Sequence, residues 1–526
     1  MPPAREPERD EGCVEYKLRL DPSTPERVQK LATQLNYRLN EGGGEAFYEL
    51  GVTDDGEPVG LTDEEAERSL QVMEQVCEIV GASYIVVRKE KAKRGHVYEL
   101  LVRRTVDTPP IQVSVVLLGN VDAGKSTLKG VLVYGQLDDG DGLAMSMVAR
   151  YLHELKFRRS SSVTFHVLGF DERGRSVNDE LGAYDEAQVY LRASKVVTLV
   201  DLAGHERYLK TTMRGVLGSA PDYACMVVAG NAGPIGSFRE HLGMAVALRI
   251  PVFVVVTKVD MAPPEVLGRT IRDIEAYLKL PGVNKIPFVV KSAGDAAVAA
   301  RNMPHGRVAP IFLVSNVTGE GLDLLKSFIN MLPPRLDWSE KQGGRFLSYV
   351  DEKFDVSGVG LVVSGLVESG SVSAGDRVLL GPFDDGSFRT VRVRSIHVNR
   401  LPVERAVAGQ MAGFALANVE YDEVRRGMVL LDLNEKPRAV REFEAKIRVL
   451  HHPTTIRPGY EPVIQLKTIR QSAKLVYCTK GVLRSGDVDT AVFRFKIRPE
   501  YINEGDVFFF REGRTKGMGR VTRLLS

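Results

Sequence analysis

The sequence predicts an α/β domain built on a mostly parallel sheet, with a small α+β domain before it and two β-barrels after it. Three observations lead to this fold class. Strand-like and helix-like stretches alternate between residues 108 and 335, as in parallel sheets with crossover helices. Short β-rich runs separated by Gly, Asp-Asp-Gly and Pro turns follow from about residue 336, which is typical of barrels. Residues 12–107 mix two helical stretches with four strand-like ones.

The expected division is a disordered tail over residues 1–11, the α+β domain over 12–107, the α/β domain over 108–335, and barrels over 336–433 and 434–526. The composition, 44% hydrophobic and 26% charged, is that of an ordinary globular protein. The start is too charged for a signal peptide, and no apolar run approaches membrane-spanning length. We therefore expect a cytoplasmic protein with no membrane partner.

The four cysteines and the charge distribution narrow the function classes. The cysteines lie far apart without C-x-x-C spacing, which argues against a metal or disulfide framework and fits a reducing compartment. The net charge of +2 indicates no particular partner. However, residues 438–523 hold 18 Lys and Arg against 9 Asp and Glu, whereas residues 5–107 hold 15 against 22. The basic C-terminal region favours a polyanionic partner, and a solvated basic surface is the alternative.

The first domain shows clear helix signals but no catalytic constellation. A helix is expected over Thr24–Asn36, and a second runs from Thr62, where the hydroxyl caps and Glu65 completes a capping box, to Ile79. A regulatory or docking module is the default interpretation. The expected strands are Glu15–Leu20, Glu45–Val52, Tyr84–Lys89 and His96–Arg103.

The central domain begins with Val113–Leu118, a run rich in β-branched residues that predicts a strand buried on both faces. A helix is expected over Gly142–Lys156. Four polar motifs each follow the C-terminal end of a predicted buried strand, and in an open α/β sheet ligands bind at that edge. The further buried strands are expected at Val196–Val200, Ala224–Val228, Pro251–Val256 and Pro310–Val314.

The first polar motif, residues 119–126, fits G-x-x-x-x-G-K-[ST] between a strand and a helix. Such a loop directs backbone N–H groups at a phosphate, and the helix N-terminus adds a favourable dipole. Lys125 is expected to reach the β- and γ-phosphates and Ser126 to ligate Mg²⁺. An ordinary Gly-rich turn is the alternative, disfavoured because both flanks fit. The residues expected around the phosphates are Gly119, Asn120, Val121, Asp122, Ala123, Gly124, Lys125, Ser126 and Thr127.

The second motif is D-x-x-G, from Asp201 to Gly204. The Asp201 carboxylate can hold Mg²⁺ through water, and the Gly204 N–H can sense a γ-phosphate. A plain strand-end turn is the alternative, which the preceding phosphate loop and buried strand disfavour.

The third and fourth motifs predict a guanine site. Asp260, in Thr257-Lys258-Val259-Asp260, can accept two N–H bonds from the ring N–H and the exocyclic amino group of guanine. Adenine cannot offer that pair, so the motifs in series select GTP over ATP. The backbone N–H groups of the fourth motif are expected to close over the base; its residues are Ser315, Asn316 and Val317.

The motifs G-N-V-D-A-G-K-S-T, D-L-A-G-H-E, T-K-V-D and S-N-V-T-G, followed by two barrels, resemble the translational GTPases, the superfamily of elongation factor Tu. Residues 201–212 resemble more narrowly the GTP-binding protein 1 family, as do residues 392–397, 450–456 and 511–516. The resemblance covers nearly the whole chain, including the acidic N-terminal domain, which elongation factor Tu lacks. It implies a P-loop GTPase domain, two barrels named domains II and III, and hydrolysis of GTP.

The resemblance also implies residue roles. His205 matches the histidine that positions the attacking water, while Mg²⁺, Lys125 and backbone donors carry the developing charge. Asp122 matches a position linked to a monovalent cation. The first switch departs from the superfamily pattern R-G-I-T-[IV]: this chain has Arg-Ser-Ser-Ser-Val at 159–163. Ser162 then falls at the Mg²⁺ ligand, with Thr164 as a rival.

In the same switch, Ser161 falls where an apolar residue usually gates the attacking water together with the position of Val121. The segment 511–516 resembles the region that contacts the tRNA acceptor arm, so Arg514 and Lys516 are expected to contact RNA phosphates. An exposed basic turn is the alternative.

The sequence thus predicts a GTP-switched carrier of tRNA-like RNA that acts at the ribosome, a monomer in isolation. One alternative is an adaptor for RNA surveillance or mRNA decay that uses GTP as a timer. Another is a GTPase subunit of a metabolic enzyme such as one for sulfate adenylylation, which the basic second barrel argues against. The identity of the RNA and the need for an exchange factor stay open.

Overall fold

The computed structural model describes residues 5, 7–8, 12–21, 24–105, 110–149, 163–181, 184–202, 215–512 and 515–525; for His451, Thr515 and Lys516 it describes the backbone only. The chain divides into two compact units. One comprises residues 1–212 and 221–336, and the other comprises residues 213–220 and 337–526. Each is described separately below.

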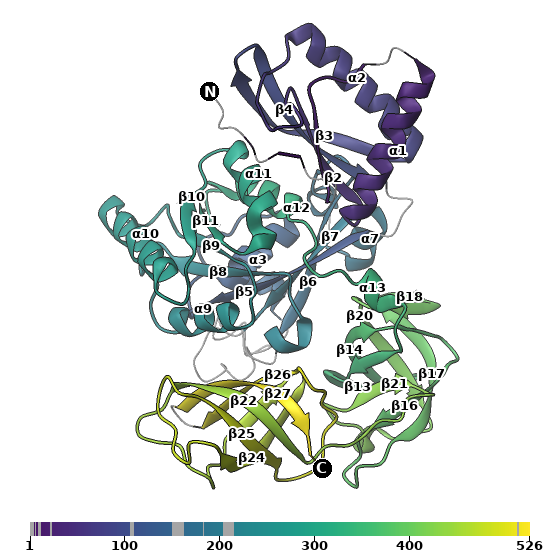
Figure 1. The fold of residues 1–526 in the computed structure, drawn as a ribbon, viewed down its shortest axis with the longest axis vertical. Helices are drawn as coiled ribbons and strands as arrows, with labels where there is room; N and C mark the ends of the chain where they lie inside the picture. The colour runs from purple at the N-terminus through teal and green to yellow at the C-terminus, as the bar shows by residue number, and fades with distance from the viewer. Residues whose placement is uncertain are drawn as a thin grey trace. The chain divides into compact units, whose positions relative to one another are not determined.

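The N-terminal domain is a four-stranded sheet in the order β1-β2-β4-β3, with β1 parallel to β2 and the other pairs antiparallel. Helices α1 and α2 pack on one face of it through a core that includes Leu35, Val72 and Leu100 (Figure 1). The predicted capping box is present, since Thr62 and Glu65 bond each other's backbone N–H groups. The elements are β1 (Val14–Lys17), α1 (Pro25–Glu41), β2 (Glu45–Leu50), α2 (Asp63–Val80), β3 (Ala82–Ala92) and β4 (Gly95–Arg104).

The opposite face of this sheet packs on the α/β domain of the same unit. Phe47 and Leu101 point away from α1 and α2 and belong to the core of the α/β domain. A buried ionic cluster lies beside them. The Glu45 carboxylate accepts from the Lys195 ammonium at 2.8 Å and from the Arg103 guanidinium at 2.6 Å. Arg103 also donates to the side chain of Asn330 at 2.7 Å. The two domains are therefore joined by both apolar and charged contacts.

The α/β domain contains a seven-stranded sheet in the order β10-β11-β9-β8-β5-β7-β6. All neighbouring strands are parallel except β6, which runs antiparallel to β7. Helices lie on both sides, with α11 and α12 above the sheet and α9 below it in Figure 1. The elements are β5 (Ile111–Gly119), α3 (Lys125–Tyr134), α4 (Leu143–Val148), β6 (Thr164–Phe170), α6 (Val177–Glu180), α7 (Glu186–Arg192), β7 (Lys195–Asp201), β8 (Tyr223–Ala229), α9 (Phe238–Ala247), β9 (Val252–Thr257), α10 (Pro264–Lys279), β10 (Ile286–Val289), α11 (Ala293–Asn302), β11 (Val308–Leu313) and α12 (Leu322–Met331).

The four motifs begin at the C-terminal ends of parallel strands, as the sequence predicts. Strands β5, β7, β9 and β11 are parallel, so the described residues at their C-terminal ends lie at the same edge. One expected element is shorter than predicted: α4 ends at Val148, because Ala149 adopts an extended backbone with ψ 132°. Strand β6 was not predicted as a strand.

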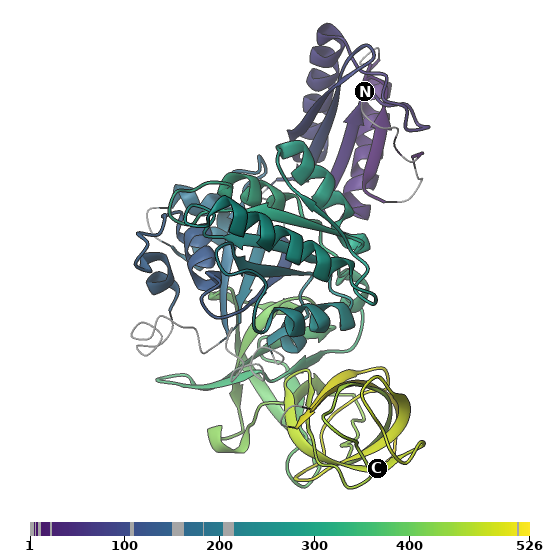
Figure 2. The same ribbon diagram turned by 90° about the vertical axis from the view of Figure 1, so that its left-hand side faces the viewer.

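The second unit holds two barrels. In the first, β12, β21, β16, β17, β20 and β14 pair in succession, and pairing of β12 with β14 closes the ring. In the second, β22 to β27 form a closed barrel, which Figure 2 shows nearly end-on in yellow. The predicted fold class is thus confirmed. The strands are β12 (Leu347–Tyr349), β13 (Glu352–Val356), β14 (Gly360–Ser369), β15 (Ser371–Ser373), β16 (Arg377–Gly381), β17 (Arg389–Val398), β18 (Leu401–Val403), β19 (Arg405–Val407), β20 (Met411–Ala417), β21 (Val429–Asp432), β22 (Glu442–His451), β23 (Val463–Leu466), β24 (Ile469–Cys478), β25 (Val488–Phe495), β26 (Val507–Glu512) and β27 (Thr515–Leu524).

In the part of the chain that the structure describes, no helix is both long enough and apolar enough to cross a membrane.

Candidate functional site

The loop between β5 and α3 has the backbone that a phosphate loop requires. Asp122 and Gly124 have positive φ, 59° and 82°, and α3 begins at Lys125. A Cβ on Gly119 would lie 2.2 Å from the carbonyl oxygen of Val227, so a side chain there would collide with β8. These constraints curl the loop over the N-terminus of α3, where backbone N–H groups lack helical partners and favour an anion.

Lys125 is nearly fully buried beneath this loop. Its ammonium donates to the carbonyl oxygens of Asn120 and Gly119, at 2.8 and 3.2 Å. Burial lowers the pKa of Lys125, and the carboxylates of Asp201 and Asp122 oppose that shift. The structure therefore places the predicted phosphate-binding lysine at the base of the loop.

The structure brings two of the described metal-ligand candidates together. The Ser126 hydroxyl donates to Asp201 Oδ2 at 2.7 Å, and Asp201 is buried at the end of β7. Among the described residues, Asp201 Oδ1 has no hydrogen-bond partner although it is buried. A buried carboxylate oxygen costs free energy unless something satisfies it. A hydroxyl beside such an oxygen supplies the hard ligands that Mg²⁺ prefers, so these residues fit the ion.

A second lysine, Lys129, lies beside the same carboxylate, that of Asp201. It is fully buried one turn along α3, with its ammonium 2.5 Å from Thr164 Oγ1 and 3.4 Å from Asp201 Oδ2. Thr164, the rival metal ligand from the sequence, is the register partner of Asp201 across β6 and β7. Its hydroxyl accepts from Lys129 in the structure.

On the base side, Thr257 links the third motif to the phosphate loop. Its hydroxyl donates to the carbonyl oxygen of Ala123 at 2.7 Å. Lys258 follows with a positive φ of 59°, and the Asp260 side chain is exposed. This arrangement leaves the Asp260 carboxylate accessible to a ligand.

The fourth motif forms a tight turn after β11. The Ser315 hydroxyl accepts the backbone N–H groups of Val317 and Thr318, at 3.2 and 3.0 Å. Asn316 is buried, and its Oδ1 has no hydrogen-bond partner within the described ranges. Since Val317 N–H is used inside the turn, Asn316 contributes the buried polar atom that is left for a ligand.

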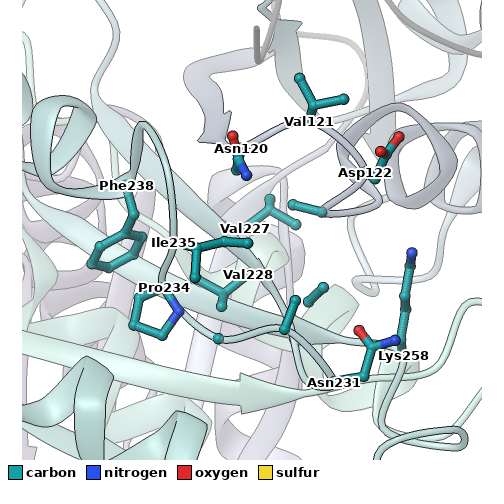
Figure 3. A pocket seen from close by; sticks show the side chains of 14 residues that line it. Asn120, Val121, Asp122, Val227, Val228, Asn231, Pro234, Ile235, Phe238 and Lys258 are labelled. Carbon is teal, nitrogen blue, oxygen red and sulfur yellow. The ribbon is translucent and has the colours of Figure 1, made fainter. Parts of the chain in front are cut away.

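A cavity of about 450 Å³ lies against the phosphate loop on the side of β8. Figure 3 shows Asn120, Val121 and Asp122 on one side of it, with Asn231 and Lys258 on another. Its lining also includes Ile235 and Phe238 but not Asp260. The cavity therefore borders the predicted phosphate site without containing the predicted guanine reader.

Some predicted site residues lie outside the described residues. For Lys516 only the backbone, in β27, is described, and Ser161 is outside as well. The predicted site residues outside are His205, Gly204, Ser162 and Arg514.

Comparison with known proteins assigns this chain to a family. The family model for the elongation factor Tu GTP binding domain matches residues 111–334, and that for elongation factor Tu domain 2 matches residues 360–431. The GTP-binding protein 1 of Xenopus laevis is 42% identical over 99% of this chain and 80% of its own length. The chain belongs to the GTP-binding protein 1 family. This family lies within the translational GTPases.

A further relative and two solved structures are also similar to this chain. GTP-binding protein 2 of Mus musculus is 41% identical over 99% of this chain and 88% of its own length. The elongation factor SelB of Methanococcus maripaludis with the GTP analogue GppNHp matches with a TM-score of 0.57 and 20% identity, covering 80% of both chains. The Ski7 GTPase-like domain of S. cerevisiae, bound to GTP, matches with a TM-score of 0.61 and 12% identity, covering 79% of this chain and 98% of that one. At these identities the two structures show a shared fold.

Two residues of this family member were missed by the sequence interpretation. His241, on α9, is buried, and its Nδ1 accepts the backbone N–H of Gly119 at 3.1 Å. No local pattern predicts this contact, because the two residues are 122 positions apart. Lys129 did leave a signal, since it is a charge within the otherwise apolar run from Leu128 to Val133.

Proposed function

We propose that this protein binds GTP and GDP with Mg²⁺ and hydrolyses GTP to GDP and phosphate. The observation that carries the proposal is the pairing of Ser126 with Asp201 beneath a phosphate loop, where the other buried oxygen of Asp201 has no hydrogen-bond partner among the residues that the structure describes. Membership of a family with an elongation factor Tu GTP binding domain supports it. The exposed Asp260 carboxylate supports guanine as the base.

Each residue then has a defined task. Ser126 and Asp201 hold Mg²⁺ against the phosphates, and Ser162 or Thr164 of the first switch completes the set. When bound, Mg²⁺ offsets negative charge on the phosphate oxygens. Lys125 adds a second positive charge, and His205 orients the attacking water. Asp122, exposed on the phosphate loop, matches the position linked to a monovalent cation.

The remaining residues position the nucleotide. The backbone N–H groups from Gly119 to Thr127 bind the phosphates, and the Gly204 N–H senses the γ-phosphate. Asp260 accepts the two N–H bonds of guanine, while Lys258 and Asn316 flank the base. Thr257 keeps the phosphate loop at a fixed distance from the base motif through its bond to Ala123.

We further propose that the GTP state carries tRNA-like RNA to the ribosome in the cytoplasm. The basic third domain supports a polyanionic partner, and its described residues locate one patch. Lys446 and Arg448 are exposed on β22, and Lys446 is the register partner of exposed Arg520 on β27. Clustered cations on one face of a barrel favour contacts to a phosphate backbone. Arg514 and Lys516 belong to the same hypothesis.

The experiment is to measure the affinity of the purified protein for aminoacyl-tRNA with a non-hydrolysable GTP analogue and with GDP. A GTP-switched carrier binds at least about tenfold more tightly in the GTP state, because the switch must couple the two sites. Equal affinity in both states, with tight GTP binding, would contradict the carrier and favour the surveillance adaptor.

A further inference from the structure

The fully buried Lys129 is a cation that the proposed function does not require. Its ammonium lies 3.4 Å from Asp201 Oδ2 and donates to Thr164 Oγ1 at 2.5 Å. Thr164 begins β6, directly after the first switch. Asp201 ends β7, where the D-x-x-G motif begins, and the two residues are register partners. Lys129 therefore joins both segments to α3, the helix that starts at the phosphate loop.

Charge balance explains why the lysine is tolerated there. A buried ammonium without a counter-ion is strongly unfavourable. Asp201 is the carboxylate within ion-pair distance of Lys129 among the described residues, and the same oxygen accepts from Ser126. The Lys125 ammonium also interacts with the Asp201 carboxylate, which opposes the lowering of the pKa of Lys125 by burial. The carboxylate proposed to hold the metal therefore also pairs with Lys129.

We propose that Lys129 is a positioning residue that weakens the coupling between Mg²⁺ and GDP. The inference rests on the proposed binding of GDP and Mg²⁺ at this site. With Mg²⁺ present, the Lys129 ammonium shares Asp201 with the ion and repels it, which weakens Mg²⁺ binding. Without Mg²⁺, the same ammonium keeps Asp201 neutralised and in place, so the carboxylate does not repel the phosphates of GDP.

Both effects act in the same direction on one measurable ratio, the rate of GDP release in EDTA divided by the rate in millimolar Mg²⁺. A chain with a neutral residue at 129 gains Mg²⁺ affinity and loses GDP affinity when Mg²⁺ is removed. Its ratio must therefore be larger than that of the wild-type protein. A purely structural Lys129 would change the stability of the protein and leave the ratio as it was.

The test uses the full chain loaded with a fluorescent GDP and chased with unlabelled GDP. Lys129→Met removes the charge at similar length, and Lys129→Gln removes it but keeps a donor for Thr164. We expect both to raise the ratio by at least about tenfold. Lys326→Met, which breaks the pair with Asp179 on the surface, is the matched control.

The outcomes separate the inference from the proposed function. A wild-type protein that does not bind GDP would overturn both. A wild-type protein that binds GDP, with an unchanged or smaller ratio in Lys129→Met and Lys129→Gln, would overturn the inference alone. If neither neutral variant binds GDP even in Mg²⁺, Lys129 belongs to the fold rather than to the coupling, and the inference is wrong.

Discussion

The Nδ1 atom of His241 accepts the backbone N–H of Gly119, the first residue of the phosphate loop, over 3.1 Å. An imidazole nitrogen can accept only when it carries no proton, so His241 must be neutral with its proton on Nε2. Burial, and to a lesser degree the Lys125 ammonium, lower the pKa of His241 to about 3. The loop is therefore anchored by a histidine that the fold keeps uncharged.

This anchor predicts a specific pH dependence. The pKa of His241 is about 3 in the folded protein and 6.5 ordinarily, so the unfolded chain binds more protons between these values. The stability from neutral His241 is complete above pH 6.5 and is lost as pH falls, by about 2 kcal/mol at pH 5. Urea unfolding of the nucleotide-free protein should show this loss in the wild type and not in His241→Gln. His305→Gln, at an exposed histidine of the same domain, should keep the wild-type profile; a loss retained in His241→Gln would refute the assignment.

Asp260 should determine which nucleotide base the protein selects. In Asp260→Asn, one of the two acceptors for guanine becomes a donor, so the guanine amino group faces an N–H group. GTP affinity is expected to fall by at least about a hundredfold, while xanthosine triphosphate, with a carbonyl at that position, should bind better than GTP. Competition binding with both nucleotides measures this. Asp273→Asn on α10 is the control, and unchanged GTP preference in Asp260→Asn would place the guanine reader elsewhere.

The buried cluster between the N-terminal and α/β domains should govern the stability of the first unit. Lys195 and Arg103 outweigh burial and lower the pKa of Glu45, which indicates an ionised carboxylate held by two cations. Glu45→Ala leaves both cations buried without it and is expected to cost about 3–5 kcal/mol of unfolding free energy. Glu57→Ala, which removes an exposed pair with Lys93, should leave the stability unchanged. Equal effects of the two substitutions would show that the cluster is not a stabilising contact.

Local chemistry made the order of the domains and the edge of the sheet predictable. The phosphate loop, Asp201, Thr257 and Asn316 each follow a hydrophobic strand, and strand ends in a parallel sheet converge without further information. Thr62 and Glu65 were likewise predictable, because a capping box is completed within four residues.

The features that the sequence did not predict depend on contacts between segments that are far apart in the chain. The bond from Gly119 to His241 and that from Lys195 to Glu45 span 122 and 150 positions, and neither leaves a periodic pattern. Lys129 appeared in the sequence as an isolated charge on an apolar helix, but its partners are set by how β6 and β7 pair. Strand β6 went unpredicted because an antiparallel edge strand has no motif at its end.

Charge reversal at the exposed cations of β22 tests whether this strand contributes to an RNA-binding surface. Lys446→Glu together with Arg448→Glu should weaken aminoacyl-tRNA binding and reduce the slope of log affinity against log salt by about one per residue. Lys291→Glu with Arg307→Glu makes the same charge change on exposed residues of the other unit and should have a smaller effect. If both pairs lowered the affinity equally, the effect would be one of net charge and the β22 patch would not be an RNA site.

The most direct test of the central claim is the rate of GTP hydrolysis by the purified protein alone, with ribosomes, and with ribosomes plus aminoacyl-tRNA. If the protein is a translational GTPase that carries tRNA-like RNA, we expect a slow intrinsic rate of GTP hydrolysis. Ribosomes with aminoacyl-tRNA should raise that rate by at least about a hundredfold. The stimulation should disappear in His205→Ala, while GTP binding remains. Tight GTP binding with no response to ribosomes would contradict the account.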